Sequence, residues 1–400
     1  MTICEIEQAA SRLRNVIHSI PVSSSKTFSH MSGSELFLKC ENLQKTGSFK
    51  VRGAYNKIAK LCEKGAIAEV VASSAGNHAQ GVAFASTSLG VASTIVMPRS
   101  APIAKTSATE GYGAKVVLYG DCYDEAYNKA LEIQEQSGAV FIHPFNDKDV
   151  IAGQATIALE VLRDIPTVDT IIIPAGGGGL LAGMATCIKQ INPRIKVVGV
   201  QAQGADAIVQ SFNKKMLVST ESSSTIADGI AVRVPGELTV SLIQQYVDEM
   251  VTVSDDEIAE AILLLLERTK MVVEPAGAAS LAAAINQKLD IAGKRVVCLL
   301  SGGNIDVSFI QKIVEKGLVA RGRQLQFKTI MPDIPGSMGH FTTLLAKVGA
   351  NIMMLQHDRR YADLHLNEAI LHVTCEVSGP EHGQEVIRIL EQCGYRITIE

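Results

Sequence analysis

Short apolar runs alternate with helical patterns over most of the chain, and this alternation limits the fold to very few classes. Between residues 35 and 301, β-branched or aliphatic runs end repeatedly in Gly, Ser or Pro, and segments with helical periodicity such as 54–62 and 256–269 separate them. Apolar strands separated by helices are typical of a parallel sheet covered on both faces, so we predict an α/β fold. The predicted strands are residues 35–39, 70–72, 94–97, 116–119, 170–173, 197–200, 250–253 and 296–300.

The pattern changes after residues 317–326, a basic, glycine-containing stretch that we interpret as a linker. The residues beyond it contain strand and helix patterns in the order β-α-β-β-α-β, the split βαβ arrangement of a ferredoxin-like fold. The sequence therefore predicts two domains, residues 1–320 and 327–400. The predicted elements of the second domain are a strand at 327–331, a helix at 337–348, strands at 352–357 and 369–377, a helix at 383–393 and a strand at 396–399.

Composition excludes several classes of protein. Hydrophobic residues make up 47% and charged residues 20% of the 400-residue chain, which excludes a disordered protein. A net charge of −4 provides no basic surface for nucleic acid, and no apolar run is long enough to span a membrane. None of the eight cysteines shows C-x-x-C spacing, and the N-terminus lacks a signal-peptide pattern. We therefore expect a cytoplasmic protein with reduced thiols, and neither nucleic acid nor membrane as a partner.

A lysine lies where a Gly/Ser turn meets a predicted helix start, in the run GSFKVRG at residues 47–53. Apolar neighbours such as Phe49 lower the pKa of an amine, and an unprotonated amine is a nucleophile. Lys50 is therefore a candidate nucleophile. Taken alone, its position is more typical of a solvated lysine in the first turn of a helix.

The run SSAGNHAQG at residues 73–81 follows a predicted strand and leads into a helix. Successive backbone N–H groups at such a turn can bind an anion, and the side chains of Asn77 and His78 would add donors. The alternative is an ordinary turn in which Ser73 or Ser74 caps the helix. The residues of this run leave both interpretations open.

Four consecutive glycines, residues 176–179, follow the predicted strand 170–173 and precede another helix. Glycine runs carry a large conformational entropy cost, which a protein tolerates where backbone must approach a ligand closely. A phosphate at a helix N-terminus is the usual reason. The run lacks the Lys-Ser/Thr pair of a nucleotide-hydrolysing loop and the G-x-G-x-x-G spacing of a dinucleotide site. A phosphorylated ligand held by backbone fits this run best.

The predicted strand 296–300 ends in the run SGGN, residues 301–304. Ser301 would stand at the carboxyl ends of the strands, where open α/β sheets bind ligands, although another tight turn would also explain the glycines. A nucleophilic lysine, a phosphate-binding loop, an anion-binding loop and a lone hydroxyl together describe a site for pyridoxal 5′-phosphate.

The runs GSFKVRGA, SSAGNHAQGVA, VIAGQATIALE, IIIPAGGGGLLAG, STIADGIAV and SGGNIDVS resemble the threonine dehydratase and serine racemase family. The resemblance covers residues 1 to about 315 and implies the tryptophan synthase β-like fold type II, two open twisted sheets flanked by helices. It also implies a small lobe, about residues 47–142, inserted in a large lobe, and pyridoxal 5′-phosphate as cofactor. Lys50 would carry the cofactor, Phe49 would flank its ring, Asn77 would contact its phenolic oxygen and Ser301 its pyridine nitrogen. The implied phosphate-binding residues are Gly176, Gly177, Gly178, Gly179 and Leu180, and the implied loop for the substrate carboxylate is Ser74, Ala75, Gly76, Asn77 and His78.

The resemblance implies conversion of L-threonine to 2-oxobutanoate and ammonia, with L-serine, which would give pyruvate, as a second substrate. A serine hydroxyl cannot protonate the pyridine nitrogen as a carboxylic acid would, so Ser301 makes the ring a weaker electron sink. A weaker sink suits elimination of a β-substituent, with Lys50 as the general base at Cα.

Departures from the family pattern distinguish the activities within it. Racemases carry a serine where Ala75 stands, so we favour a threonine dehydratase over a serine dehydratase or racemase. Racemase-like members bind a divalent cation through carboxylates at the positions of Gln201, Ala205 and Ala207, so we expect no metal. The remaining alternatives are a non-catalytic amino-acid sensor, against which the intact site residues argue, and a β-replacement synthase.

Residues 327–400 resemble an ACT domain, most clearly in the run MPDIPGSM at 331–338. Gly336 would let a small ligand approach the N-terminus of the next helix, which favours a carboxylate. The resemblance implies regulation by amino acids, such as those of isoleucine biosynthesis, and assembly into a homodimer or homotetramer. A purely structural dimerisation module is the alternative.

Overall fold

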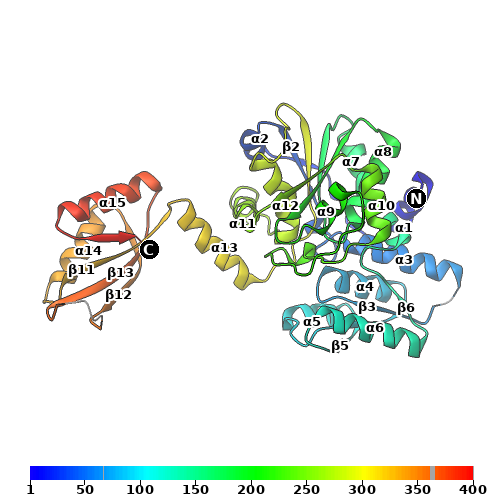
Figure 1. The fold of residues 1–400 in the computed structure, drawn as a ribbon, viewed down its shortest axis with the longest axis horizontal. Helices are drawn as coiled ribbons and strands as arrows, with labels where there is room; N and C mark the ends of the chain where they lie inside the picture. The colour runs from blue at the N-terminus through cyan, green and yellow to red at the C-terminus, as the bar shows by residue number, and fades with distance from the viewer. Residues whose placement is uncertain (66, 361–364, 400) are drawn as a thin grey trace. The chain divides into compact units, whose positions relative to one another are not determined.

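The computed structural model describes residues 1–65, 67–360 and 365–399. The chain forms two compact units, Met1–Ile305 and Asp306–Glu400 (Figure 1). The predicted first domain ended at residue 320, whereas this division falls earlier, because helix α13 (Val307–Ala320) packs on strand β11 (Gln324–Pro332) of the second unit. The helix and the strand also occupy most of the stretch that we predicted as a linker.

The first unit is built on a six-stranded sheet with the order β1-β2-β10-β7-β8-β9, in which β1 is antiparallel to β2 and all other pairs are parallel. Alternate residues of its strands face different helices: Ile171 and Ile173 pack in the core with Leu181, while Cys298 contacts Ser280. Helices therefore cover both faces, as the apolar strands predict. The strands are β1 (Ser23–Ser24), β2 (Glu35–Cys40), β7 (Thr170–Pro174), β8 (Lys196–Ala202), β9 (Glu249–Val253) and β10 (Arg295–Leu300).

A second, fully parallel sheet with the order β5-β4-β3-β6 forms the small lobe of the first unit (Figure 1). Val70 and Ile95 pack on one face with Val82 of α4, and Val71 and Val96 pack on the other face with α6. The chain enters this lobe between β2 and β3 and returns between β6 and β7, so the small sheet is an insertion in the large one. The strands are β3 (Glu69–Ser73), β4 (Ala92–Met97), β5 (Lys115–Leu118) and β6 (Val140–Phe141).

The helices of the first unit connect and cover these two sheets. The predicted helix 54–62 lies within α3, and the predicted helix 256–269 lies within α11 and the η3 helix that follows it. Two sheets with flanking helices confirm the predicted α/β fold of type II. The helices are α1 (Ile3–Leu13), α2 (Lys26–Ser32), η1 (Glu41–Leu43), α3 (Lys50–Lys64), α4 (Asn77–Ser88), α5 (Ile103–Gly111), α6 (Tyr123–Ser137), α7 (Lys148–Asp164), α8 (Gly179–Ile191), α9 (Ala207–Lys214), η2 (Asp228–Ile230), α10 (Glu237–Tyr246), α11 (Asp255–Leu264), η3 (Leu265–Thr269) and α12 (Pro275–Ile285).

The second unit contains a four-stranded antiparallel sheet with the order β12-β13-β11-β14. Phe327, Phe341, Val373 and Leu390 form the centre of its core. The order of strands and helices confirms the predicted β-α-β-β-α-β arrangement. The elements after β11 are α14 (Ser337–Lys347), β12 (Asn351–Asp358), β13 (Glu368–Glu376), α15 (Pro380–Gln392) and β14 (Ile397–Ile399). Within the described residues of both units, no helix combines the length and apolar character needed to cross a bilayer.

Candidate active site

Lys50 is the first residue of α3, as the sequence predicts. Two contacts hold its turn against the end of β10: Ser48 pairs with Gly302 in a β-bridge, and the N–H of Phe49 donates to the carbonyl of Ser301 at 3.1 Å. The Lys50 amine donates to the carbonyl of Pro144 at 3.0 Å. The side chain is half-buried, and desolvation lowers its pKa from 10.5 to about 8, which favours the nucleophile over the solvated lysine of the alternative interpretation.

The loop 73–77 exposes the start of α4 without a side-chain cap. The N-cap residue is Gly76 rather than Ser73 or Ser74, and the Ser74 hydroxyl accepts only from the N–H of Gly76 at 3.2 Å. The Ser73 hydroxyl is buried without a partner among the described residues. The capped-turn alternative is therefore wrong, and the N–H groups of the first turn, which begins at Asn77, are open to an anion.

The side chain of His78 does not supply the donor that the sequence predicts. Its Nε2 lies 2.8 Å from the carbonyl of Ile142, which can only accept, so Nε2 carries the proton. Burial lowers the pKa of His78 to about 3, so the ring is neutral and its buried Nδ1 has no hydrogen to donate. Of the groups of His78, only the backbone N–H can therefore contribute to an anion site at this helix start.

The four glycines connect β7 to α8 through backbone that leaves no room for side chains. A Cβ at Gly177 would lie 2.3 Å from the ring of Phe145, and one at Gly176 would lie 2.9 Å from Cα of Ile230. Gly178 has a φ of +91°, and no side chain caps the helix that begins at Gly179. The following Leu180 is 6% exposed and its side chain packs in the hydrophobic core, so it offers a ligand no side-chain contact. This loop fits a phosphate held by N–H groups alone.

Ser301 directly follows β10 and is 3% exposed. Its hydroxyl forms no hydrogen bond within the described residues but keeps some exposure, whereas the hydroxyl of Ser48 is fully buried and has no partner among them. Buried polar groups are normally paired, so the Ser48 hydroxyl favours a ligand in the site, and the Ser301 hydroxyl is free to bond to one. Together with the half-buried amine and the two open helix starts, the two hydroxyls fit a phosphorylated, aldehyde-bearing cofactor.

Sequence reasoning missed Glu274, which lies just before Pro275 at the start of the fully buried helix α12. Its Oε1 accepts a hydrogen bond from Nδ2 of Asn77 at 2.7 Å, and burial raises its pKa from 4.5 to about 7. The signal that could have identified Glu274 is its position directly before a helical segment, 275–285, that has no polar face and is therefore buried on all sides. Sequence reasoning included Asn304 in the run SGGN but gave it no role, although its Nδ2 donates to Oδ1 of Asn77 at 2.6 Å.

Comparison with known proteins identifies the family. The family model described as "Pyridoxal-phosphate dependent enzyme" matches residues 13–302. This chain belongs to the pyridoxal-phosphate dependent enzymes. The family membership confirms the prediction of pyridoxal phosphate as cofactor.

Several members of this family are similar over most of the chain. The L-threonine ammonia-lyase of Thermotoga maritima is 47% identical over 399 residues, covering 100% of this chain and 99% of its own. The L-threonine ammonia-lyase of Geobacter sulfurreducens is 46% identical over 395 residues, covering 98% of each chain. Among solved structures, processed threonine deaminase isoform 2 from Solanum lycopersicum is 37% identical, with a TM-score of 0.74 over 79% of this chain and 89% of that one. Maize serine racemase is also 37% identical, with a TM-score of 0.73 over 80% and 98%.

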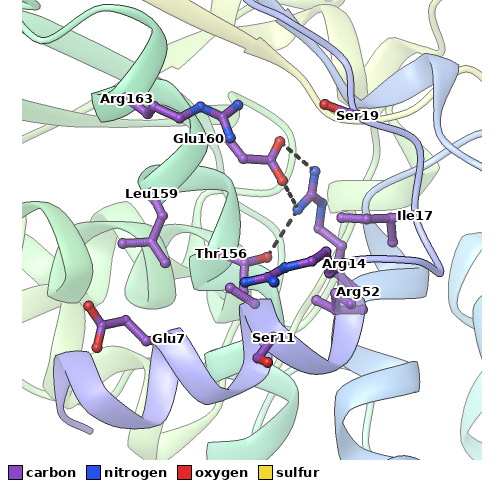
Figure 2. A pocket seen from close by; sticks show the side chains of 12 residues that line it. Glu7, Ser11, Arg14, Ile17, Ser19, Arg52, Thr156, Leu159, Glu160 and Arg163 are labelled. Atoms are coloured by element: carbon purple, nitrogen blue, oxygen red, sulfur yellow. Dashed lines mark hydrogen bonds and ion pairs between the residues drawn. The ribbon is translucent and has the colours of Figure 1, made fainter.

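A hollow of about 420 Å³ lies beside the start of α3, between α1 and α7, but it is a poor candidate for the active site of this enzyme family (Figure 2). At its floor, the guanidinium of Arg52 donates to Thr156, Glu160 and Glu41. These bonds use all five N–H groups of the arginine and leave none for a ligand. The buried ion pairs instead anchor α3, two residues after Lys50.

The residues at the positions where racemase-like members bind a cation have other contacts. The side-chain oxygen of Gln201 accepts from the N–H of Val209 at 2.9 Å, and Ala205 and Ala207 are buried. The nearby Asp206 accepts from Gln210 at 2.8 Å. Across residues 1–65, 67–360 and 365–399, no three His, Cys, Asp or Glu side chains are grouped so that they could hold a metal ion. Metal independence stays a prediction.

Proposed function

We propose that this chain is a threonine ammonia-lyase that converts L-threonine to 2-oxobutanoate and ammonia, and L-serine to pyruvate as a second reaction. The observation that carries the proposal is the half-buried amine of Lys50, held by the carbonyl of Pro144 and with a pKa lowered to about 8, in a unit where α4 and α8 begin without a side-chain cap. The similarity to L-threonine ammonia-lyases over almost the whole chain supports the choice of substrate.

When bound, pyridoxal phosphate supplies a conjugated ring that withdraws electrons from the Cα of the amino acid. Lys50 takes the Cα proton as general base, and its lowered pKa keeps part of the amine unprotonated near neutral pH. The carbonyl of Pro144 orients this amine through its hydrogen bond. The proton from Cα and the β-hydroxyl together leave as one water, and addition of one water to the resulting enamine gives the 2-oxo acid and ammonia.

Backbone groups hold the two anionic parts of the site. The N–H groups of residues 176–180 would hold the cofactor phosphate, and those at the start of α4 would hold the substrate carboxylate. Phe49 would flank the ring, Asn77 would donate to the phenolic oxygen, and the Ser301 hydroxyl would bond to the pyridine nitrogen. Ala75 has no group that could return a proton to Cα, so the loop 74–78 favours elimination over racemisation.

We further propose that the second unit is an ACT domain that regulates the enzyme by binding an amino acid. Gly336, with a φ of +94°, precedes α14, and no side chain caps this helix. The alignment with the Thermotoga relative covers all of this chain, the second unit included, whereas the alignment with a Staphylococcus aureus L-threonine dehydratase covers 80% of it. Assembly into a homodimer or homotetramer belongs to the same proposal. A location in the cytoplasm belongs to it as well, and the eight free cysteines support it.

A 2-oxo acid assay with L-threonine and L-serine, each with and without L-isoleucine and L-valine, tests this function. We expect 2-oxobutanoate from threonine at a higher rate than pyruvate from serine, and a change of rate with a branched-chain amino acid. Lys50→Ala should abolish both products and the absorption of the bound cofactor. Racemised amino acid without 2-oxo acid would contradict the lyase proposal.

A further inference from the structure

Groups from three distant parts of the chain fix the amide of Asn77. Its Oδ1 accepts from Nδ2 of Asn304 at 2.6 Å, and its Nδ2 donates to Oε1 of Glu274 at 2.7 Å. Nδ2 of Asn304 also donates to the backbone carbonyl of Thr46 at 2.8 Å. A continuous chain of hydrogen bonds thus runs from Thr46 through both asparagines to the carboxyl group.

The carbonyl of Thr46 determines the orientation of both amides. A carbonyl can only accept a hydrogen bond, so Asn304 must turn its NH2 group toward Thr46 and Asn77. Asn77 must then present its oxygen to Asn304, which leaves its own NH2 group facing Glu274. A flipped Asn77 would place two NH2 groups against each other and lose the hydrogen bond between the asparagines. One orientation of Asn77 is therefore selected.

Asn304 is itself held tightly by neighbouring backbone. Gly47 has a φ of +69°, and a Cβ at this position would lie 2.3 Å from Oδ1 of Asn304. The N–H of Gly303 donates to the carbonyl of Gly47 at 2.8 Å. Because the loops 46–49 and 301–304 are bonded to each other, the amide between them has little freedom to turn.

We propose that Asn304 is a positioning residue that turns the NH2 group of Asn77 toward the bound cofactor. The inference rests on the proposed contact between Asn77 and the phenolic oxygen of pyridoxal phosphate. An amide NH2 group carries two hydrogens, and Glu274 accepts one of them, so the other can be donated to that oxygen. Asn304 acts only through Asn77.

Asn304→Asp and Asn304→Ala distinguish orientation from packing. The aspartate variant keeps the shape but replaces the donor with an acceptor, so Asn77 turns its NH2 group away from the cofactor. The alanine variant leaves Asn77 free to adopt either orientation. We expect cofactor affinity to fall about tenfold in the aspartate variant and less in the alanine variant, the change expected for one hydrogen bond to a charged oxygen. If Asn304 acted only by filling space, the alanine variant would lose more cofactor affinity than the aspartate variant.

The readouts are the dissociation constant of pyridoxal phosphate, from fluorescence titration, and the pH midpoint of the absorption of the bound cofactor. The midpoint should shift upward in Asn304→Asp because an anionic oxygen loses a donor. Asn286→Asp is the matched control: its Nδ2 donates to the carbonyl of Ala282 at 3.0 Å, at the other end of α12 from Glu274. The control should change neither readout, and thermal unfolding of each apoprotein reports any loss of the fold.

An Asn304→Asp variant with normal affinity and an unshifted midpoint would overturn the inference, as would an alanine variant that binds the cofactor more weakly than the aspartate variant. Asn77→Ala separates this failure from that of the proposed function. If Asn77→Ala leaves the absorption unchanged, the contact between Asn77 and the cofactor is absent. If it shifts the absorption and Asn304→Asp does not, only the positioning role fails.

Discussion

Gly177→Ala tests whether the phosphate-binding loop depends on the absence of a side chain. A Cβ at position 177 would lie 2.3–2.4 Å from three ring atoms of Phe145, whereas nonbonded carbons approach to about 3.5–4.0 Å. The backbone is no obstacle, because Gly177 is not among the residues with positive φ, unlike Gly178 at +91°. The ring or the loop must therefore move by about 1 Å or more to accept the methyl group.

Overpacking of this kind costs about 1–3 kcal/mol. If the whole of this cost is lost from the free energy of cofactor binding, the dissociation constant of pyridoxal phosphate rises by about 5- to 150-fold. Fluorescence titration measures this constant, and calorimetry of the apoprotein measures the change in stability. Gly111→Ala is the control: it lies at the end of α5, where a Cβ would meet nothing within 4 Å, so cofactor affinity should not change.

A double-mutant cycle with Phe145→Leu identifies the cause of the loss. Removing the ring should make room for the methyl group, so Gly177→Ala should weaken cofactor binding much less in the leucine background than in the natural chain. The same loss in both backgrounds would refute the reasoning, since the clash with Phe145 would then not be the cause. A change in affinity with Gly111→Ala would show that the assay does not isolate the loop.

Four further outcomes can be measured. Reductive methylation of Lys50 in the apoprotein should rise through pH 8, because desolvation lowers its pKa from 10.5 to about 8; a midpoint near 10.5 would contradict a desolvated amine. Arg52→Ala should lower the free energy of unfolding by about 3–5 kcal/mol, since the buried Glu41 would lose both hydrogen bonds from the guanidinium and keep only the Lys39 amine, 4.0 Å away; an unchanged melting temperature would contradict this. Activity toward threonine should survive dialysis against EDTA, and restoration only by added magnesium would show that a metal is needed. Deletion of residues 306–400 should preserve 2-oxobutanoate formation and abolish the response to branched-chain amino acids; a retained response would place the effector site in the first unit.

Backbone features were predictable from the sequence because they are encoded locally. The helix start at Lys50, the turn at residues 176–179 and the strand that ends before Ser301 all follow from neighbouring residues. Glycine and hydrophobic periodicity report which conformations a short segment can adopt. The same local signals explain why the elements of the second unit were predicted in the correct order.

Side-chain partners were not predictable because they come from distant segments. Asn77 is separated by 197 residues from Glu274 and by 227 from Asn304, and no pattern within either run indicates these contacts. His78 shows the converse: its position in the loop suggested a donor, but the carbonyl of Ile142 occupies its protonated nitrogen. Tertiary contacts thus decide which polar residues of a correctly predicted loop can bind a ligand.

The insertion of the small sheet determines where the reactive amine lies within the lobed unit. The chain crosses between the lobes twice, from β2 to β3 and from β6 to β7. Lys50 is on the first crossing and its partner Pro144 is on the second, so one hydrogen bond joins the two crossings. Asn77, at the start of α4 in the small lobe, forms two further hydrogen bonds with Glu274 and Asn304 of the large lobe. The reactive amine therefore lies where the two lobes are bonded to each other, and the edge strand β5 is the strand of the small sheet furthest in order from the crossing at β6.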